Sequence, residues 1–314
     1  MKKYLLKRIL SIIPVFIVVG ILAFMLVHLI PGNPAKVMLG SEGTPSQVAN
    51  LEKSMGLDRP LIIQFFVWSG RILTGNFGKS VYSGDSVIGD IASHLGVTIS
   101  LSVFAMIIAI ALSIPISIYA VNHKKSFINP LVSGVSMLGV SIPSFWLSLM
   151  AILLFCVTWR IFPVSGYVSI FDDPFQWLRH IFLPAAILGV LQMGIITRML
   201  KNSMLEHYSD NFILMARSTG ESNKEMIRSH LFKNALIPTI TVIGNSFASL
   251  LGGAVVVETI FALPGVGQLF VTSITNRDYP MIQGIIIIMA SIYVLVNLVV
   301  DFSYSFLDPR IELQ

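Results

Sequence analysis

Long apolar runs recur along the whole chain, and they constrain the fold more than any other feature. An α-helix needs about 20 predominantly apolar residues to cross the hydrocarbon core of a bilayer. Of the 314 residues, 54% are hydrophobic and only 12% are charged, whereas roughly 25% are charged in a typical soluble domain. The sequence therefore predicts an all-α membrane protein with about six transmembrane helices, placed near 9–30, 97–121, 130–158, 181–200, 237–260 and 281–303.

The first apolar run follows a basic tail, as the core of a signal peptide does. The run 9–30 is longer than a signal core of about 7–15 residues, and no Ala-x-Ala-like cleavage site follows it. We therefore expect a retained first span. The predicted divisions are 1–96, the first helix with a long extracytoplasmic loop; 97–305, a five-helix core with a cytoplasmic loop at 201–236; and 306–314, a C-terminal tail.

The distribution of lysine and arginine predicts the orientation, because these residues accumulate in cytoplasmic loops. They crowd the N-terminal tail, the short loop near 123–125 and the loop that covers 198–233. The segment 31–96 instead dilutes its Lys and Arg residues and balances them with Asp and Glu. Both termini are therefore expected in the cytoplasm and 31–96 outside. These loops also explain the net charge of +5 without a nucleic-acid partner.

Catalytic and metal-binding patterns are missing from the sequence. The segment Gly75–Ser80 resembles the end of a P-loop, but Leu73 stands where the full pattern needs glycine. The segment also lies on the predicted outer side. The six histidines are scattered, and Cys156 is the only cysteine, so no zinc-type spacing occurs. We expect this chain to have no enzymatic activity and to bind no cofactor or metal.

Ionisable side chains are scarce in the predicted spans. His28, Glu258 and Asp301 lie near span ends, where water or headgroups are within reach. An ion-coupled secondary transporter usually carries such groups near the membrane midplane. The energy for any transport is therefore expected to come from outside this chain.

Two places within the spans are candidates for a solute pathway. Ser141 and Pro143 belong to a segment whose proline predicts a kink, either beside a pathway or for packing alone. In the fifth span, a stripe of small residues that includes Gly244 either permits close helix packing or leaves room for a solute. Asn245 and Ser249 are the candidate pathway residues there.

The cytoplasmic loop 201–236 has the pattern of a helix, a glycine turn and a second helix. Ser209–Asn211 offers N-cap residues, and Gly220 occupies the position of a C′ glycine. Ser222–Glu225 is a capping-box pattern that begins a second helix at about 223–236. Pro238 is then predicted near the first turn of the fifth span. The first helix has an apolar face formed by Phe212, Ile213, Met215 and Ala216. These side chains cannot all face water, so we expect them to lie on the bilayer or to insert into a partner.

The same loop carries a family resemblance. Ala216–Gly220 and Asn234–Pro238 resemble the cytoplasmic motif of ABC-importer permeases, in the subfamily that transports peptides and nickel. Further matches follow in order along the chain: His28–Ala35, Gly56–Leu61, Gly75–Ser80, Val257–Gly267, Arg277–Gln283, Asp301 and Asp308–Arg310. One position departs from the pattern, because Thr219 stands where the family typically has lysine. This departure leaves the glycine turn intact, but it removes the basis for expecting a specific charge contact at position 219.

The resemblance implies a type I ABC-importer permease fold in the bacterial cytoplasmic membrane, forming half of a translocation pathway. It implies a second homologous permease subunit, two cytoplasmic ATPase subunits that bind ATP and Mg, and an extracytoplasmic solute-binding protein, together with the lipid bilayer. Coupling to the ATPase is then assigned to Ala216, Arg217, Gly220, Glu221 and Lys224. An extracytoplasmic gate or loop is assigned to Glu258, Phe261, Pro264, Gly265 and Gly267.

The resemblance leaves several substrates open. Di- or oligopeptides, including glutathione-like tripeptides, are the first expectation, and nickel or a metal–chelator complex is the alternative. No His- or Met-rich stripe lines a span, which disfavours a bare metal ion. In other classes, a secondary transporter needs a midplane ionisable group or an inverted repeat, and a membrane scaffold does not need a glycine-jointed loop.

Overall fold

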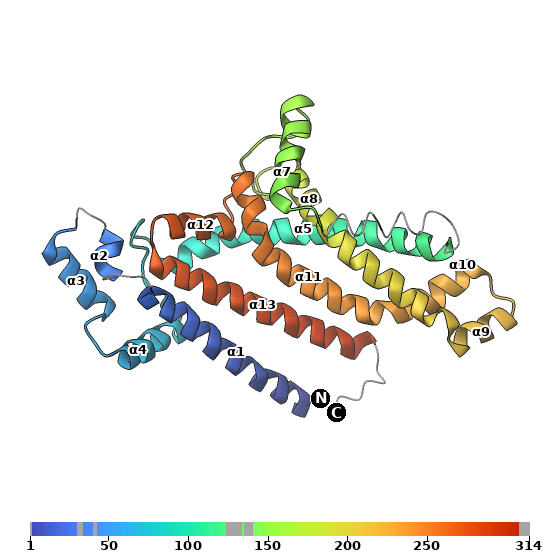
Figure 1. The fold of residues 1–314 in the computed structure, drawn as a ribbon, viewed down its shortest axis with the longest axis horizontal. Coiled ribbons are helices and arrows are strands. Elements are labelled where there is room, and N and C mark those ends of the chain that lie inside the picture. The colour runs from blue at the N-terminus through green and yellow to red at the C-terminus, as the bar shows by residue number, and fades with distance from the viewer. Residues whose placement is uncertain (1, 30–33, 40–42, 124–133, 135–140, 308–314) are drawn as a thin grey trace. The chain divides into compact units, whose positions relative to one another are not determined.

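The computed structural model describes residues 2–29, 34–39, 43–123, 134 and 141–307 (Figure 1). Its regular structure is helical, and the described residues contain no strand beyond one isolated bridge between Lys79 and Ser86. Two compact units divide the chain. Unit 1 takes its described residues from Met1–Gly96 and Gly265–Val294, and unit 2 from Val97–Pro264 and Leu295–Glu312. The predicted all-α class is confirmed.

Among the described residues, five helices are long and apolar enough to cross a membrane: α1 (Lys2–Leu29), α5 (Val87–Asn122), α8 (Pro174–Glu206), α11 (Phe232–Ile260) and α13 (Tyr279–Leu307). They correspond to five of the six predicted spans. The remaining prediction, 130–158, is described at residue 134 and from residue 141 onward. There α7 (Ser144–Ala151) continues into a π-helix, η2 (Ile152–Thr158). The rest of that predicted span lies outside the described residues.

The segment predicted as a long loop, 31–96, is largely helical where it is described. It contains α2 (Pro34–Leu39), α3 (Pro45–Met55), α4 (Leu61–Leu73) and the start of α5. Local signals explain α3: Thr44 and Gln47 form a reciprocal capping box, and Gly56 ends the helix at φ +71°. The polar residues and glycines of this segment therefore separate short helices. For this reason the composition of 31–96 resembles that of a loop.

A buried carboxylate organises part of unit 1. Asp278 accepts a hydrogen bond from the Ser80 hydroxyl, and its other oxygen accepts from the backbone N–H groups of Val81 and Met281, each at 3.3 Å. This contact joins the segment before α5 to the start of α13. The glycine at position 284 in α13 packs so closely that an added Cβ would lie 2.5 Å from the Val87 side chain. Unit 1 thus joins residues that are far apart in sequence through polar contacts and close packing.

The core of unit 2 lies among α5, α8 and α11. Gly189 of α8 approaches α5 so closely that an added Cβ would be 2.8 Å from the Ala105 carbonyl oxygen. Farther along the same pair of helices, the Ser117 hydroxyl donates to the Thr197 carbonyl oxygen at 3.2 Å. Small residues thus let these spans pack backbone to backbone, as membrane helices commonly do.

The predicted boundary between the cytoplasmic loop and the fifth span is wrong. α10 (Asn223–Met226), a π-helical turn η4 (Ile227–Leu231) and α11 form one continuous helical stretch. Pro238 therefore lies inside α11 and not in its first turn. A proline removes one backbone hydrogen bond, but a membrane helix tolerates it where neighbouring groups satisfy the released carbonyl.

Candidate functional site

The segment between α8 and α11 forms two short helices around a glycine turn, as predicted. The 3₁₀ turn η3 (His207–Ser209) leads into α9 (Asn211–Ser218), and α10 follows the turn. Gly220 has φ +85°, a left-handed conformation that glycine adopts without steric cost. No atom lies within 4 Å of a Cβ built at this position. The backbone conformation, and not a lack of space, therefore requires glycine.

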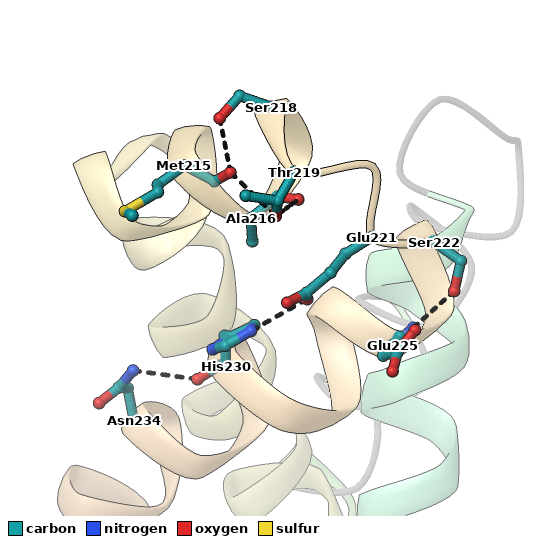
Figure 2. Close-up of polar contacts among 9 residues, drawn as sticks. All are labelled: Met215, Ala216, Ser218, Thr219, Glu221, Ser222, Glu225, His230 and Asn234. Carbon is teal, nitrogen blue, oxygen red and sulfur yellow. Dashed lines mark hydrogen bonds and ion pairs between the residues drawn. The ribbon is translucent and has the colours of Figure 1, made fainter.

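Hydrogen bonds close the turn on both sides (Figure 2). The Glu221 N–H donates to the Ala216 carbonyl oxygen at 3.1 Å, which is the long bond of a Schellman C-cap. The Thr219 hydroxyl, at the position where the family typically has lysine, donates to the same carbonyl oxygen at 2.9 Å. On the other side, the Ser222 hydroxyl oxygen accepts the Glu225 N–H at 3.2 Å and caps α10.

One apolar cluster attaches both short helices to the ends of the long ones. Its buried members are Val121, Leu200, Met204, Ile213, Ala216, Met226, Ile227, Leu231 and Ala235. Burial of a side chain the size of Ile213 is worth roughly 1.5–3 kcal/mol. The expectation that the apolar face of α9 lies on the bilayer or in a partner is therefore wrong for Ile213 and Ala216, which pack within unit 2.

The other apolar side chains of α9 point away from this cluster. Phe212, Leu214 and Met215 are exposed, and Met215 has 69% of its surface accessible. Figure 2 shows the Met215 side chain projecting outward, while the Ala216 methyl group points toward the helix that carries His230. α9 therefore has one apolar side that anchors it and another that is uncovered in this chain.

The predicted coupling residues gather around this turn but differ in their surroundings. Glu221 Oε2 lies 3.0 Å from His230 Nε2 and links the turn to η4 (Figure 2). Lys224 is exposed on α10. Arg217 lies on α9, and its side chain is outside the described residues. The contact with His230 could not be predicted from the sequence, because a separation of nine residues across a turn matches no helical spacing.

The three predicted gate residues in unit 2 lie at and after the end of α11. Glu258 is fully buried, and its Oε1 accepts a hydrogen bond from the Thr98 hydroxyl of α5 at 2.7 Å. The expectation that Glu258 reaches water or headgroups is therefore wrong within this chain. Phe261 is buried in the same core, whereas Pro264 is exposed.

The two remaining gate residues belong to unit 1. Gly265 is the N-cap residue of α12 (Val266–Thr275), with an extended backbone, and Gly267 is buried in the first turn of that helix. The predicted set is thus divided at the junction between Pro264 and Gly265. The structure brings Glu258 and Phe261 into one core, and it places the two glycines in the other unit.

The candidate pathway residues lie on two elements of unit 2. Ser141 is exposed, and Pro143 is the N-cap residue of α7. On α11, Asn245 and Ser249 are exposed on one face, together with Gly252 at the next helical repeat. The close-packing reading of the small-residue stripe is supported at Gly244. Gly244 is buried and packs on α13, where an added Cβ would meet Val300 at 2.0 Å.

Comparison with known proteins defines the class to which this fold and this loop belong. The chain is a member of the family described as the binding-protein-dependent transport system inner membrane component, which matches residues 113–313. The corresponding N-terminal family part matches residues 1–102. The chain is therefore a multi-pass transport permease of the inner membrane and not a catalytic subunit. The resemblance stated from its motifs is confirmed.

Individual relatives extend over the full length of the chain. A putative peptide transport system permease protein of Brucella abortus strain 2308 is 40% identical over 312 residues, which cover 99% of both chains. The dipeptide transport system permease protein of Escherichia coli K12 is 35% identical over 336 residues, with 99% of each chain covered. A solved structure, the MetNI methionine ABC transporter in an inward-facing conformation, matches with a TM-score of 0.59 at 15% identity, over 70% of this chain and 97% of that chain. This likeness confirms the type I importer permease fold.

Proposed function

We propose that this chain is the permease subunit of an ATP-driven importer for di- or oligopeptides and forms half of its translocation pathway. The observation that carries the proposal is full-length similarity to permeases named for peptide and dipeptide transport. The similarity to these relatives does not support nickel over peptides as the substrate. The alternatives of a secondary transporter and a scaffold lose support, because the family belongs to binding-protein-dependent transport systems.

In this proposal α9 is the helix that couples the permease to a cytoplasmic ATPase subunit. Its exposed Phe212, Leu214 and Met215 provide an apolar surface for a groove in the ATPase. Its buried Ile213 and Ala216 attach it to α8 and α11. A displacement of α9 is then transmitted to these spans, because a packed core moves as a unit. Glu221 and Lys224 are exposed enough to set the register of that contact.

The pathway proposal rests on the exposed face of α11. Asn245 and Ser249 are polar side chains in a membrane-spanning helix, and polar groups in lipid are costly unless they meet water or a partner. A second, homologous permease supplies the opposite wall in this arrangement. Ser141 and Pro143 at the start of α7, and the gate set from Glu258 to Gly267, remain candidate elements of the same pathway.

The proposed assembly assigns each remaining task to a partner. Two ATPase subunits bind ATP and Mg on the cytoplasmic side, where α9 and both chain termini lie. A solute-binding protein delivers the peptide to the side that carries α2, α3 and α4. The lysine and arginine distribution along the chain supports this orientation.

Reconstitution tests the function directly. Proteoliposomes that contain the complete transporter and its binding protein should accumulate labelled di- and tripeptides, and only with ATP on the ATPase side. The permease purified alone should hydrolyse no ATP. Accumulation of a nickel chelate that excess peptide does not inhibit, without peptide uptake, would contradict the peptide assignment.

A further inference from the structure

The short helix α4 in unit 1 directs its polar groups toward the protein. Gln64 is buried, and its side-chain Oε1 lies 3.0 Å from His28 Nε2 at the end of α1. Its side-chain amide donates to the carbonyl oxygens of Leu57 at 3.1 Å and Arg59 at 2.7 Å. One turn later, the Trp68 indole N–H donates to a side-chain oxygen of α13 at 3.2 Å. The inward side of α4 is thus held by hydrogen bonds.

The outward side of α4 is apolar. Ile62, Phe66 and Leu73 are 72%, 68% and 87% exposed, and their spacing of four and seven residues places them on one face. A helix on an aqueous surface has the opposite arrangement, with its apolar stripe against the core and its polar side outward. At the start of α3 in the same unit, by contrast, the polar side chains of Ser46 and Gln47 are exposed. The polar inward side and the apolar outward side of α4 therefore indicate that its outward side contacts a medium other than water.

Contacts with membrane-spanning helices fix the depth of α4. The apolar stretch Leu10–Leu29 of α1 has 20 residues, and at about 1.5 Å per residue it matches a hydrocarbon core of about 30 Å. His28 is therefore at the hydrocarbon boundary, and its contact with Gln64 places α4 at the same level. The oxygen that accepts from Trp68 belongs to Gln283, whose amide also donates to the Ala23 carbonyl oxygen of α1 at 3.0 Å. With 13 residues, α4 is about 20 Å long and too short to cross.

Cations lie beside this helix. Lys53, Arg59 and Arg71 line a cleft of about 100 Å³, together with His28 and Trp68. Within the described part of the chain, no ion pair joins these three cations to a carboxylate. Cationic side chains next to an apolar face match the layered chemistry of a bilayer surface, where phosphate groups lie just outside the acyl chains.

We propose that α4 lies in the membrane interface, with Ile62, Phe66 and Leu73 among the acyl chains and with Arg59 and Arg71 at the lipid phosphates. The occupant of its apolar face is thus phospholipid. The assignment to the outer leaflet rests on the proposed orientation, whereas the lipid contact rests only on α1 as a membrane span. α4 then anchors the segment between the first two long helices at a fixed depth.

Lipid-resolved quenching tests this inference on the complete transporter in nanodiscs. In a Cys156→Ala background, Phe66→Cys carries an environment-sensitive fluorophore, and Asn50→Cys on the exposed surface of α3 serves as the matched control. Spin-labelled phospholipids should quench the probe at position 66 several-fold more than the probe at position 50. Iodide in the buffer should do the reverse. The double variant Arg59→Gln/Arg71→Gln should reduce the extra quenching seen with anionic spin-labelled lipids.

Each alternative gives a different result. Strong iodide quenching at position 66 would show that α4 faces water and would overturn the proposal. Shielding from both quenchers would show a protein cover, such as the second permease, and would also overturn it. An impermeant thiol reagent should label Asn50→Cys from outside. Labelling only from the cytoplasmic side would overturn the leaflet assignment and the proposed orientation, and peptide uptake is measured independently of all three results.

Discussion

Two short helices outside the long spans, α4 in unit 1 and α9 in unit 2, are attached to their units in opposite ways. α9 is attached by buried apolar side chains, Ile213 and Ala216, and it exposes both its hydrogen-bonded turn and a second apolar side for the proposed ATPase contact. α4 buries Gln64 and exposes its large apolar side chains. The difference follows from the surroundings. A helix beside water gains by burying apolar surface, whereas a helix beside lipid must bury its polar groups because lipid cannot satisfy them.

The largest effect is expected where the attachment of α9 is overfilled. Ala216→Trp places an indole in a cluster that holds a methyl group, and overpacking of this kind costs about 1–3 kcal/mol or more. α9 must then shift relative to α8 and α11. We expect peptide uptake by the complete transporter to fall by about tenfold or more, in line with a coupling energy of a few kcal/mol. The amount of permease in the membrane should stay unchanged.

A small substitution at the same position is the matched control. Ala216→Ser adds one oxygen atom that can bond to the backbone of its own helix, so uptake should remain close to that of the unmodified transporter. Normal uptake by the tryptophan variant would show that the buried side of α9 does not transmit movement. The contrast between α4 and α9 would then describe only how each helix is attached, with no consequence for transport.

Local patterns made five of the spans and the turn of α9 predictable from sequence. Length and apolarity are properties of continuous segments, and Gly220 marks its turn wherever the helices pack. The contacts of Glu258 with Thr98 and of Asp278 with Ser80 could not be predicted, because their partners are 160 and 198 residues away. The burial of Glu258 was missed for the same reason.

α4 shows a second limit of sequence patterns. Leu61–Leu73 is almost entirely apolar, but it is too short for a span and has no alternating polar side. Its orientation is set by Gln64, which is polar yet faces inward, and this becomes evident only when the position of His28 is known. The folded arrangement therefore reveals a reversed polarity that a helical pattern alone does not indicate.

A smaller effect is expected when the polar attachment of α4 is removed. Gln64→Leu keeps the size of the side chain but leaves the Leu57 and Arg59 carbonyl oxygens without their donor, at about 1–3 kcal/mol for an unsatisfied buried group. Hydrogen–deuterium exchange should increase across 57–68, while peptide uptake falls less than in Ala216→Trp. Gln64→Asn, which retains the amide on a shorter side chain, should give an intermediate increase. Unchanged exchange in the leucine variant would show that apolar packing, and not hydrogen bonding, holds α4.

The smallest effect is expected at the cap of α10, where a hydrogen bond and the apolar cluster act together. Ser222→Ala removes the acceptor for the Glu225 N–H, and the loss of an N-cap costs about 1 kcal/mol. Met226 and Ile227 remain buried in the cluster, so we expect faster amide exchange only in the first turn of α10 and little change in uptake. Ser222→Asp keeps an acceptor at the N-terminus and should restore slow exchange. A loss of uptake as large as that of Ala216→Trp would show that the polar turn, and not the apolar cluster, determines the position of α9, and the proposed contrast with α4 would have to be abandoned.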